Sequence, residues 1–165
     1  MNLRNRLWLF VLSLVLFIPF SAFGQDMSAQ AGGRNVQAMK FAAIPGLPAC
    51  TPGSVESGDP TKGAFIVLAK MPAGCTVPWH WHSANERLML VSGVAQVETK
   101  DGKPLQLEAG GFAMMPAQHV HLFRCERACL LYVDSDGAFD IHYVNAQGKE
   151  IPAADALKTP KHRNF

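Results

Sequence analysis

The chain has little net charge and lacks the short motifs that mark several large enzyme classes. Its 165 residues include 15 basic and 13 acidic ones. Arg4 and Arg6 belong to an apolar N-terminal leader, and without them the basic residues number 13, equal to the acidic ones. A neutral chain of this size has no electrostatic basis for binding nucleic acid. A glycine-rich phosphate loop and a nucleophilic triad signature are also missing from the sequence.

Cysteine is scarce and does not occur in the pairs typical of thiolate metal sites. Cys50, Cys75, Cys125 and Cys129 include no CxxC pair, which favours disulfides or buried thiols over metal ligands. Four cysteines allow three pairings, and the sequence leaves the choice among them open. Cys125 and Cys129 flank a short polar interruption between two apolar segments. A disulfide across that predicted turn is geometrically reasonable.

No apolar run reaches the length of about 20 residues that spans a membrane. Residues 7–18 form a shorter apolar core behind the basic pair, Pro19 ends it, and residues 22–24 include the small side chains that a signal peptidase recognises. No cysteine lies near this cut, which argues against a lipoprotein anchor. We expect residues 1–24 to be a signal peptide and the mature protein to be periplasmic or secreted, with no stable membrane anchor after cleavage. The alternative is an uncleaved N-terminal anchor.

Helical patterns and internal repeats are nearly absent from the remaining chain. Residues 25–63 are rich in Gln, Ser, Gly and Pro, which predicts a flexible lead-in and then an extended arm. Residues 64–146 contain short apolar segments bounded by Gly, Pro and Asp, and this pattern predicts about eight to ten strands in an all-β sandwich or barrel. One of these strands is predicted to end at residues 92–93, and the last one to cover residues 139–144. Residues 147–165 form a polar tail, with one short helix expected around residues 153–158.

Four residues that can bind a metal occur at spacings that would bring them together in a barrel. His80 and His82 alternate along a predicted strand, so their side chains point the same way. Glu86 follows after enough residues for a tight turn, and His121 lies in a later strand-like segment. Inward-facing positions of neighbouring strands line one cavity. The sequence therefore predicts a divalent metal site, with Fe, Mn, Zn, Ni or Cu all compatible with these ligands.

Other side chains near these four have less specific patterns. His119 shares a face with His121, so it could support the ligands or replace one, although an ordinary histidine at the barrel mouth is the alternative. Trp79 and Trp81 have the opposite parity to the histidine pair and are expected to pack outward. Methionines at 89, 114 and 115 are predicted to lie in the core or the pocket lining. Arg87 and Arg124 could reach an anionic substrate, although a solvated surface charge is the alternative. His142 is expected at the surface.

The segment 74–93 resembles the first motif of the cupin family. That motif has a glycine, a His-x-His pair, a glutamate and a second glycine, which here are Gly74, His80, His82, Glu86 and Gly93 with every spacing kept. The resemblance implies a double-stranded β-helix, the cupin or jelly-roll barrel, over residues 64–146. It also implies that the metal ligands are the two motif histidines, the glutamate and a histidine from a second motif.

The second cupin motif is only partly kept. Gly110 and Pro116 fit it, and His121 falls on the ligand position. Gln118 stands where the motif has glycine, and Cys125 stands where it usually has asparagine. Neither is a ligand position, but the loop before His121 could differ because glycine supplies a backbone angle that glutamine tolerates poorly.

The resemblance is strongest to small exported bacterial cupins similar to the cupin-like half of ChrR-type anti-sigma factors. It implies a small-molecule ligand or substrate at the metal, with metal-dependent dioxygenation as the reaction expected by analogy. A metal-dependent binding or sensing module without turnover is the alternative. Isomerisation or epimerisation of a sugar lacks a supporting lysine or tyrosine pattern. The arm within residues 25–63 could cover a sheet edge, so a homodimer is compatible with the sequence, which leaves the oligomeric state open.

Overall fold

The computed structural model describes residues 32–100 and 102–158. The predicted signal peptide, the first residues of the lead-in and the end of the C-terminal tail lie outside the described residues. Strands dominate the described part, as predicted, and its helices are η1 (Val36–Ala38) and α1 (Ala153–Ala156), the latter at the predicted place in the tail. Neither of these two helices has the length and apolar character needed to cross a membrane.

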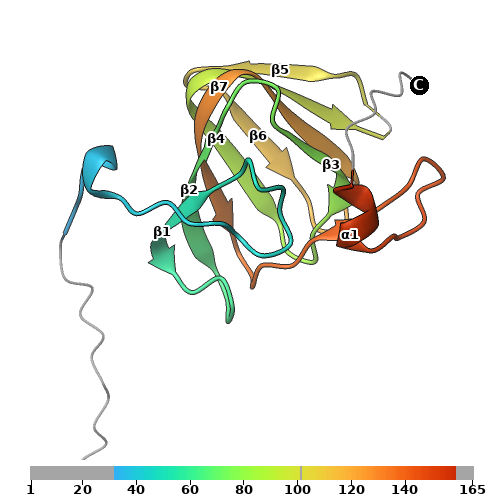
Figure 1. Cartoon of the computed structure of the whole chain (residues 1–165), viewed down its shortest axis with the longest axis horizontal. Coiled ribbons are helices and arrows are strands. Elements are labelled where there is room, and N and C mark those ends of the chain that lie inside the picture. Colours follow the sequence, from blue (N-terminus) through green and yellow to red (C-terminus); the bar gives the residue numbers. More distant parts are fainter. Residues whose placement is uncertain (1–31, 101, 159–165) are drawn as a thin grey trace, which may run out of the picture. The chain divides into compact units, whose positions relative to one another are not determined.

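The strands form one sheet that curls into a jelly-roll barrel (Figure 1). They are β1 (Gly53–Gly58), β2 (Phe65–Met71), β3 (Thr76–Trp81), β4 (Glu86–Thr99), β5 (Leu105–Glu108), β6 (Phe112–Met115), β7 (His121–Ser135) and β8 (His142–Tyr143). The order along the sheet is β1-β2-β7-β3-β8, and β4 pairs with β5, β6 and β7. Every pairing is antiparallel. The predicted all-β fold class is confirmed.

Strand β7 connects the barrel because it pairs with three other strands. Its second half, residues 129–135, pairs with β2, and its first half, residues 121–124, pairs with β3. Strand β4 pairs with it along almost its whole length on the other side. The sequence predicted a break in β4 at residues 92–93 and a turn in β7 at residues 126–128. Both strands instead continue through these points, where their pairing register shifts at bulges.

Gly93 makes the bulge between β4 and β7 sterically acceptable. Its φ is +100°, in the left-handed region that other residues rarely adopt. A Cβ atom at this position would lie 2.2 Å from the carbonyl oxygen of Ala128. Any side chain would therefore push the two strands apart. The second glycine of the 74–93 motif thus has a structural function in the register of the barrel.

Alternation of inward and outward side chains separates the core from the surface. In β6, Ala113 and Met115 are buried, whereas Phe112 and Met114 face solvent. Of the three methionines predicted to lie inside, only Met115 is fully buried, and Met89 is half-buried. The prediction for Met114 is wrong, because strand parity places its side chain on the outer face.

Part of the segment predicted as a lead-in and arm is built into the barrel. Strand β1 lies within it, so the sheet begins at Gly53, earlier than the predicted boundary at residue 64. Residues 42–51, here called the strap, pack against the barrel. Ala42 forms a bridge with Gly53, and the Tyr143 hydroxyl donates a hydrogen bond of 2.8 Å to the carbonyl of Gly46. Leu47 packs against the hydrophobic core.

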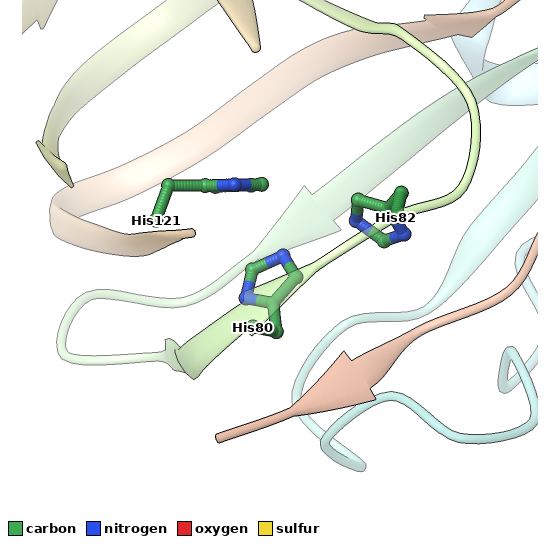
Figure 2. A group of neighbouring side chains, drawn as sticks. All are labelled: His80, His82 and His121. Atoms are coloured by element: carbon green, nitrogen blue, oxygen red, sulfur yellow. The ribbon is translucent and has the colours of Figure 1, made fainter. Parts of the chain in front are cut away.

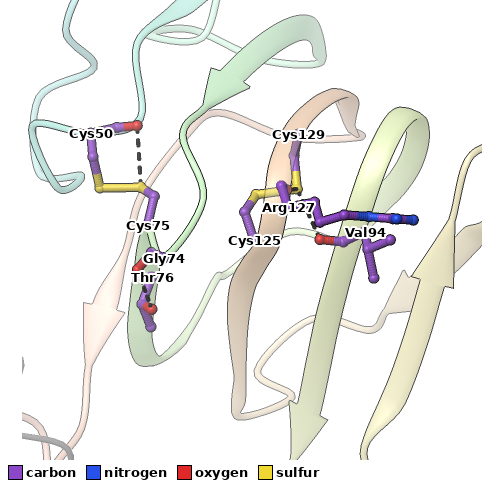
Figure 3. Close-up of a disulfide and its surroundings, with 8 residues drawn as sticks. All are labelled: Cys50, Gly74, Cys75, Thr76, Val94, Cys125, Arg127 and Cys129. Atoms are coloured by element: carbon purple, nitrogen blue, oxygen red, sulfur yellow. Dashed lines mark hydrogen bonds between the residues drawn. A yellow bond between two sulfur atoms is a disulfide. The ribbon is translucent and has the colours of Figure 1, made fainter.

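The four cysteines form two disulfides (Figure 3). Cys50–Cys75 ties the strap to the residue that precedes β3, and Cys125–Cys129 closes the bulge in β7. Residues four apart in an extended strand would have α carbons about 13 Å apart, but those of Cys125 and Cys129 are 5.9 Å apart. The chain therefore loops out between these two residues.

The disulfides are expected to differ in their contribution to stability. Replacing Cys50 and Cys75 by alanine should lower the free energy of unfolding by about 3 kcal/mol, because this bond closes a long loop in the unfolded chain. The sequence separations are 25 for Cys50–Cys75 and 4 for Cys125–Cys129. The control variant Cys125→Ala/Cys129→Ala should lose less, about 2 kcal/mol. Denaturant unfolding measures both, and a larger loss in the control would contradict the expectation.

Candidate metal site

His80, His82 and His121 meet in the barrel interior (Figure 2). His80 and His82 point to the same side because they alternate at the end of β3. His80 lies opposite His121 in the β3–β7 pairing, which brings in the third imidazole. One ring nitrogen from each histidine lies within 4.8 Å of the others, and all three side chains are buried. The structure thus assembles three of the four predicted ligands.

Each imidazole is held by a main-chain carbonyl group through its Nδ1 atom. The pairs are His80 with Pro78 at 2.6 Å, His121 with His119 at 2.9 Å, and His82 with Asp140. A carbonyl oxygen can only accept a hydrogen bond, so Nδ1 carries the proton in each ring. The Nε2 atom of each neutral ring therefore keeps a free lone pair. This tautomer is the one that binds a metal through Nε2.

Glu86 reaches the same cluster from the start of β4. Its Oε2 atom lies 3.2 Å from Nε2 of His121, and its Oε1 atom lies 3.6 Å from Nε2 of His82. The Nε2 atom of His121 is buried without a hydrogen-bond partner. A carboxylate oxygen and an unprotonated nitrogen both present lone pairs, so their close approach requires a proton or a metal cation between them. A metal ion meets this requirement.

The donor set fits a divalent transition metal. Imidazole nitrogens with a carboxylate oxygen suit borderline ions such as iron, manganese, zinc, nickel and copper. Metal-bound histidines commonly donate their other N–H to a carbonyl group, as all three do here. The four cysteines are paired as disulfides, so no thiolate competes for this role. The three histidines can hold a metal ion.

The electrostatic environment produces the protonation states that metal binding needs. Burial lowers the pKa of His80 well below its ordinary value of 6.5, and the neighbouring His121 and His82 lower it further. Burial alone would raise the pKa of Glu86, but the contact with His121 and the attraction of the three imidazoles in their protonated form outweigh it and bring the pKa to about 2. At neutral pH, His80 is therefore neutral and Glu86 is ionised.

The cluster faces a cavity of about 860 Å³, which extends between the barrel and the strap. A cavity of this volume lies within the range of about 300–1,000 Å³ in which small molecules bind. The three histidines and Glu86 all line it. A small molecule in the cavity would therefore reach a metal held by them.

Comparison with protein families identifies the fold and the segment that carries the cluster. A family model described as a cupin domain matches residues 67–133. The matched residues run from β2 into β7 and contain His80, His82, Glu86 and His121. Residues 67–133 of the chain are a cupin domain. The resemblance of the 74–93 segment to the first cupin motif is thereby confirmed, whereas the narrower likeness to ChrR-type anti-sigma factors stays a prediction.

Solved structures similar to this cupin share its fold at low sequence identity. DMSP lyase DddQ from Ruegeria pomeroyi DSS-3 has a TM-score of 0.57 and 20% identity, over 68% of this chain and 64% of that one. KdgF from a Halomonas species has a TM-score of 0.54 and 16% identity, over 64% and 94% of the two chains. An RmlC-like cupin from Shewanella frigidimarina has a TM-score of 0.55 and 18% identity, over 65% and 91%.

These likenesses show the fold alone. This cupin spans less than two thirds of the DMSP lyase, because the match covers 64% of that chain. None of the curated proteins matches the chain. The reaction and the ligand must therefore be argued from the residues of the site.

The loop before His121 has a glycine-like backbone angle at Gln118, although glutamine tolerates this angle poorly. Gln118 replaces the motif glycine and has a φ of +61°, the one non-glycine residue of the described chain in the left-handed region. Its N–H donates a hydrogen bond of 2.8 Å to the carbonyl of His82. This bond joins the two motif loops. The glutamine therefore adopts the glycine-like angle, with a strain that this loop has to absorb.

Asp140 positions His82 from a part of the chain that sequence reasoning assigned to a strand over residues 139–144. Strand β8 is shorter than that prediction and contains only His142 and Tyr143. Asp140 lies outside this strand. Its carbonyl accepts the hydrogen bond from His82, and its carboxylate accepts one of 2.8 Å from the N–H of Ser83. The sequence carried no signal for this function, because the contact to His82 joins residues 58 apart and uses a main-chain oxygen.

Asn85 links the turn before Glu86 to two other segments. Its side-chain N–H donates a hydrogen bond of 2.7 Å to Asp136, and its side-chain oxygen accepts one of 3.0 Å from the N–H of Ala117. The loops that carry Glu86 and His121 are thus joined by one side chain. Sequence reasoning did not identify Asn85, although it lies next to a predicted ligand.

The remaining predicted residues take different places. The metal-binding group of the described chain does not include the imidazole of His119, which supports a ligand through its carbonyl instead. Trp81 packs away from the cavity, as its parity predicted, and stacks on His142 with ring centroids 3.9 Å apart. Arg87 pairs with Asp134 at 2.6 Å and does not line the cavity.

The metal-free protein should lose stability in acid. His80 has a lowered pKa when folded and an ordinary value of 6.5 when unfolded, so below pH 6.5 the unfolded chain takes up a proton that the folded chain does not. Glu86 adds a second loss as the pH falls from 4.5 towards 2. Each proton contributes up to about 1.4 kcal/mol per pH unit.

Denaturant unfolding of chelator-treated protein across this range measures the effect. In the variant His80→Gln, the free energy of unfolding should change less with pH just below pH 6.5, because this variant lacks the buried titrating group. Equal stability of the metal-free wild type on both sides of that pH would contradict the interpretation.

Proposed function

We propose that this cupin binds a divalent metal through His80, His82, Glu86 and His121 and uses it to bind or transform a small organic molecule. One observation carries the proposal. Each histidine donates Nδ1–H to a main-chain carbonyl, so three free Nε2 lone pairs meet one carboxylate. Such an arrangement of buried acceptors is costly without a cation. Fe, Mn, Zn, Ni and Cu remain the candidate ions.

The bound metal would supply a Lewis acid with coordination positions open to a ligand from the cavity. The surrounding residues then have separate tasks. The carbonyl groups of Pro78, His119 and Asp140 fix the imidazole rings. The apolar cavity excludes water from the reacting end of the ligand. By analogy with the cupin family, dioxygenation of the bound molecule is the reaction we propose first.

One observation favours the alternative, a binding or sensing module without turnover. Apart from the cluster, the carboxylates that line the cavity are Asp59 and Asp140 in the described chain. Both already accept hydrogen bonds, from Thr61 and Lys62 and from Ser83 respectively. The cavity thus offers no evident free acid or base. Oxygen consumption by the iron-loaded protein on ring and dione substrates separates the two functions.

We also propose that the protein is exported, to the periplasm or the exterior. The leader at residues 1–24 has the pattern of a signal peptide, and disulfides form in oxidising compartments. The two disulfides of the barrel support the proposal. The homodimer that the sequence allows also stays a proposal.

Removing one ligand should abolish metal binding. His82→Ala and His121→Ala are expected to lower metal affinity more than about a hundredfold, since loss of a supporting residue alone commonly costs ten- to a hundredfold. His119→Ala is the matched control, because His119 acts through its main-chain carbonyl, which the substitution keeps. Elemental analysis after dialysis gives the metal content of each folded variant.

Unchanged metal content in His82→Ala would overturn the site. Equal loss in all three variants would show that the metal depends on general folding and not on these ligands. Circular dichroism of each variant confirms that the barrel is intact before the metal is measured.

A further inference from the structure

We propose that the cavity takes a molecule with an uncharged, apolar body and a single oxygen-bearing end that binds the metal. The proposal deepens the proposed function and rests on it, because the metal at the histidine cluster receives the polar end. It concerns a different part of the site, the wall that would contact the rest of the molecule.

The wall of the cavity is almost entirely apolar. Inward-facing side chains of several strands form its inner part, among them Val67, Met71, Leu88, Phe123, Leu131 and Val133. Burial of apolar ligand surface against such a wall is favourable by about 25 cal/mol per Å². A polar ligand body would lose its bound water here without gaining hydrogen bonds.

The cavity offers no cation to an anionic ligand body. No lysine or arginine is among the residues that line it in the described chain. Arg87, one of the two arginines considered for an anionic substrate, is paired with Asp134 away from the cavity. The charged groups that do line it, Asp59, Glu86 and Asp140, are carboxylates. A second carboxylate or phosphate on the ligand would lose its bound water here without a lysine or arginine to pair with, which is strongly unfavourable.

The strap extends the apolar wall on the outer side. Ile44 and Leu47 of the strap line the same cavity as Phe65 and Phe139 of the barrel segment. The strap is held covalently by Cys50–Cys75 and by the hydrogen bond from Tyr143 to Gly46. This part of the wall is therefore in place before a ligand binds, and little ordering cost arises on binding.

Alkyl hydroxamic acids test the proposal, because their two oxygens bind a metal while the alkyl tail varies. Isothermal titration of the metal-loaded full chain should show affinity rising about fourfold with each added methylene group. A hydroxamate of equal length that ends in a carboxylate should bind at least about tenfold more weakly. Affinity that does not depend on tail length, or tighter binding of the carboxylate tail, would overturn the proposal.

Two lysine variants locate the tail in the cavity. Val55 lines the cavity and is 45% exposed, so Val55→Lys should be tolerated and should supply the missing cation. Val91 is 46% exposed on β4 but does not line the cavity, which makes Val91→Lys the matched control. The measured quantity is the affinity for the alkyl hydroxamate divided by the affinity for the hydroxamate that ends in a carboxylate. Val55→Lys should reduce this ratio at least about fivefold, and Val91→Lys should leave it unchanged. Equal preferences in the two variants would contradict the assigned position of the tail.

The outcomes separate this inference from the proposed function. Wild-type protein that takes up no metal would refute the proposed function itself. Protein that holds metal but binds all hydroxamates alike would refute the apolar ligand class alone. Hydroxamate binding that persists after chelation would show that the polar end does not bind a metal.

Discussion

The pairing of β3 with β7 is the constraint on which the site depends. It places His80 opposite His121 and, through alternation along β3, directs His82 to the same side. The same strand β7 is held on its other side by β4, which begins with Glu86. A shift of one residue in either pairing would turn a ligand to the outer face. The metal site therefore forms only when both strand pairings have this register.

The register is fixed by features that lie outside the site. Gly93 and the Cys125–Cys129 bulge adjust the long β4–β7 pairing. Asn85 and the N–H of Gln118 then join the loops that carry the ligands. The glycine-like backbone angle at Gln118 keeps this link although the side chain is larger. These contacts explain how four residues from three strands and their loops meet in one place.

Local pattern predicted the parts of the site that depend on local geometry. Alternation of His80 and His82 predicts a shared face, and the cupin spacing adds Glu86 and His121. The bulges were missed because a glycine beside exposed residues is typical of a turn as well as of a bulge. Asp140 was missed because it acts through a main-chain oxygen on a residue far away in the sequence.

The contacts of the strap with the barrel also could not be predicted from the local sequence. Its proline- and glycine-rich composition predicts a flexible arm, yet Cys75 and Tyr143 fix it to the barrel. Both partners are distant in sequence, so composition alone cannot indicate the contact. The strap forms one wall of the mostly apolar cavity that the metal cluster faces. The contacts that hold the strap therefore also determine which ligands can reach the metal.

A crystal structure of the metal-loaded protein, with diffraction measured at the absorption edge of the metal, tests the central claim most directly. The account predicts one strong anomalous peak about 2.0–2.2 Å from the Nε2 atoms of His80, His82 and His121 and from a carboxylate oxygen of Glu86. A peak bound by Nδ1 atoms, a peak at other residues, or a loaded crystal with no peak in the cluster would contradict it.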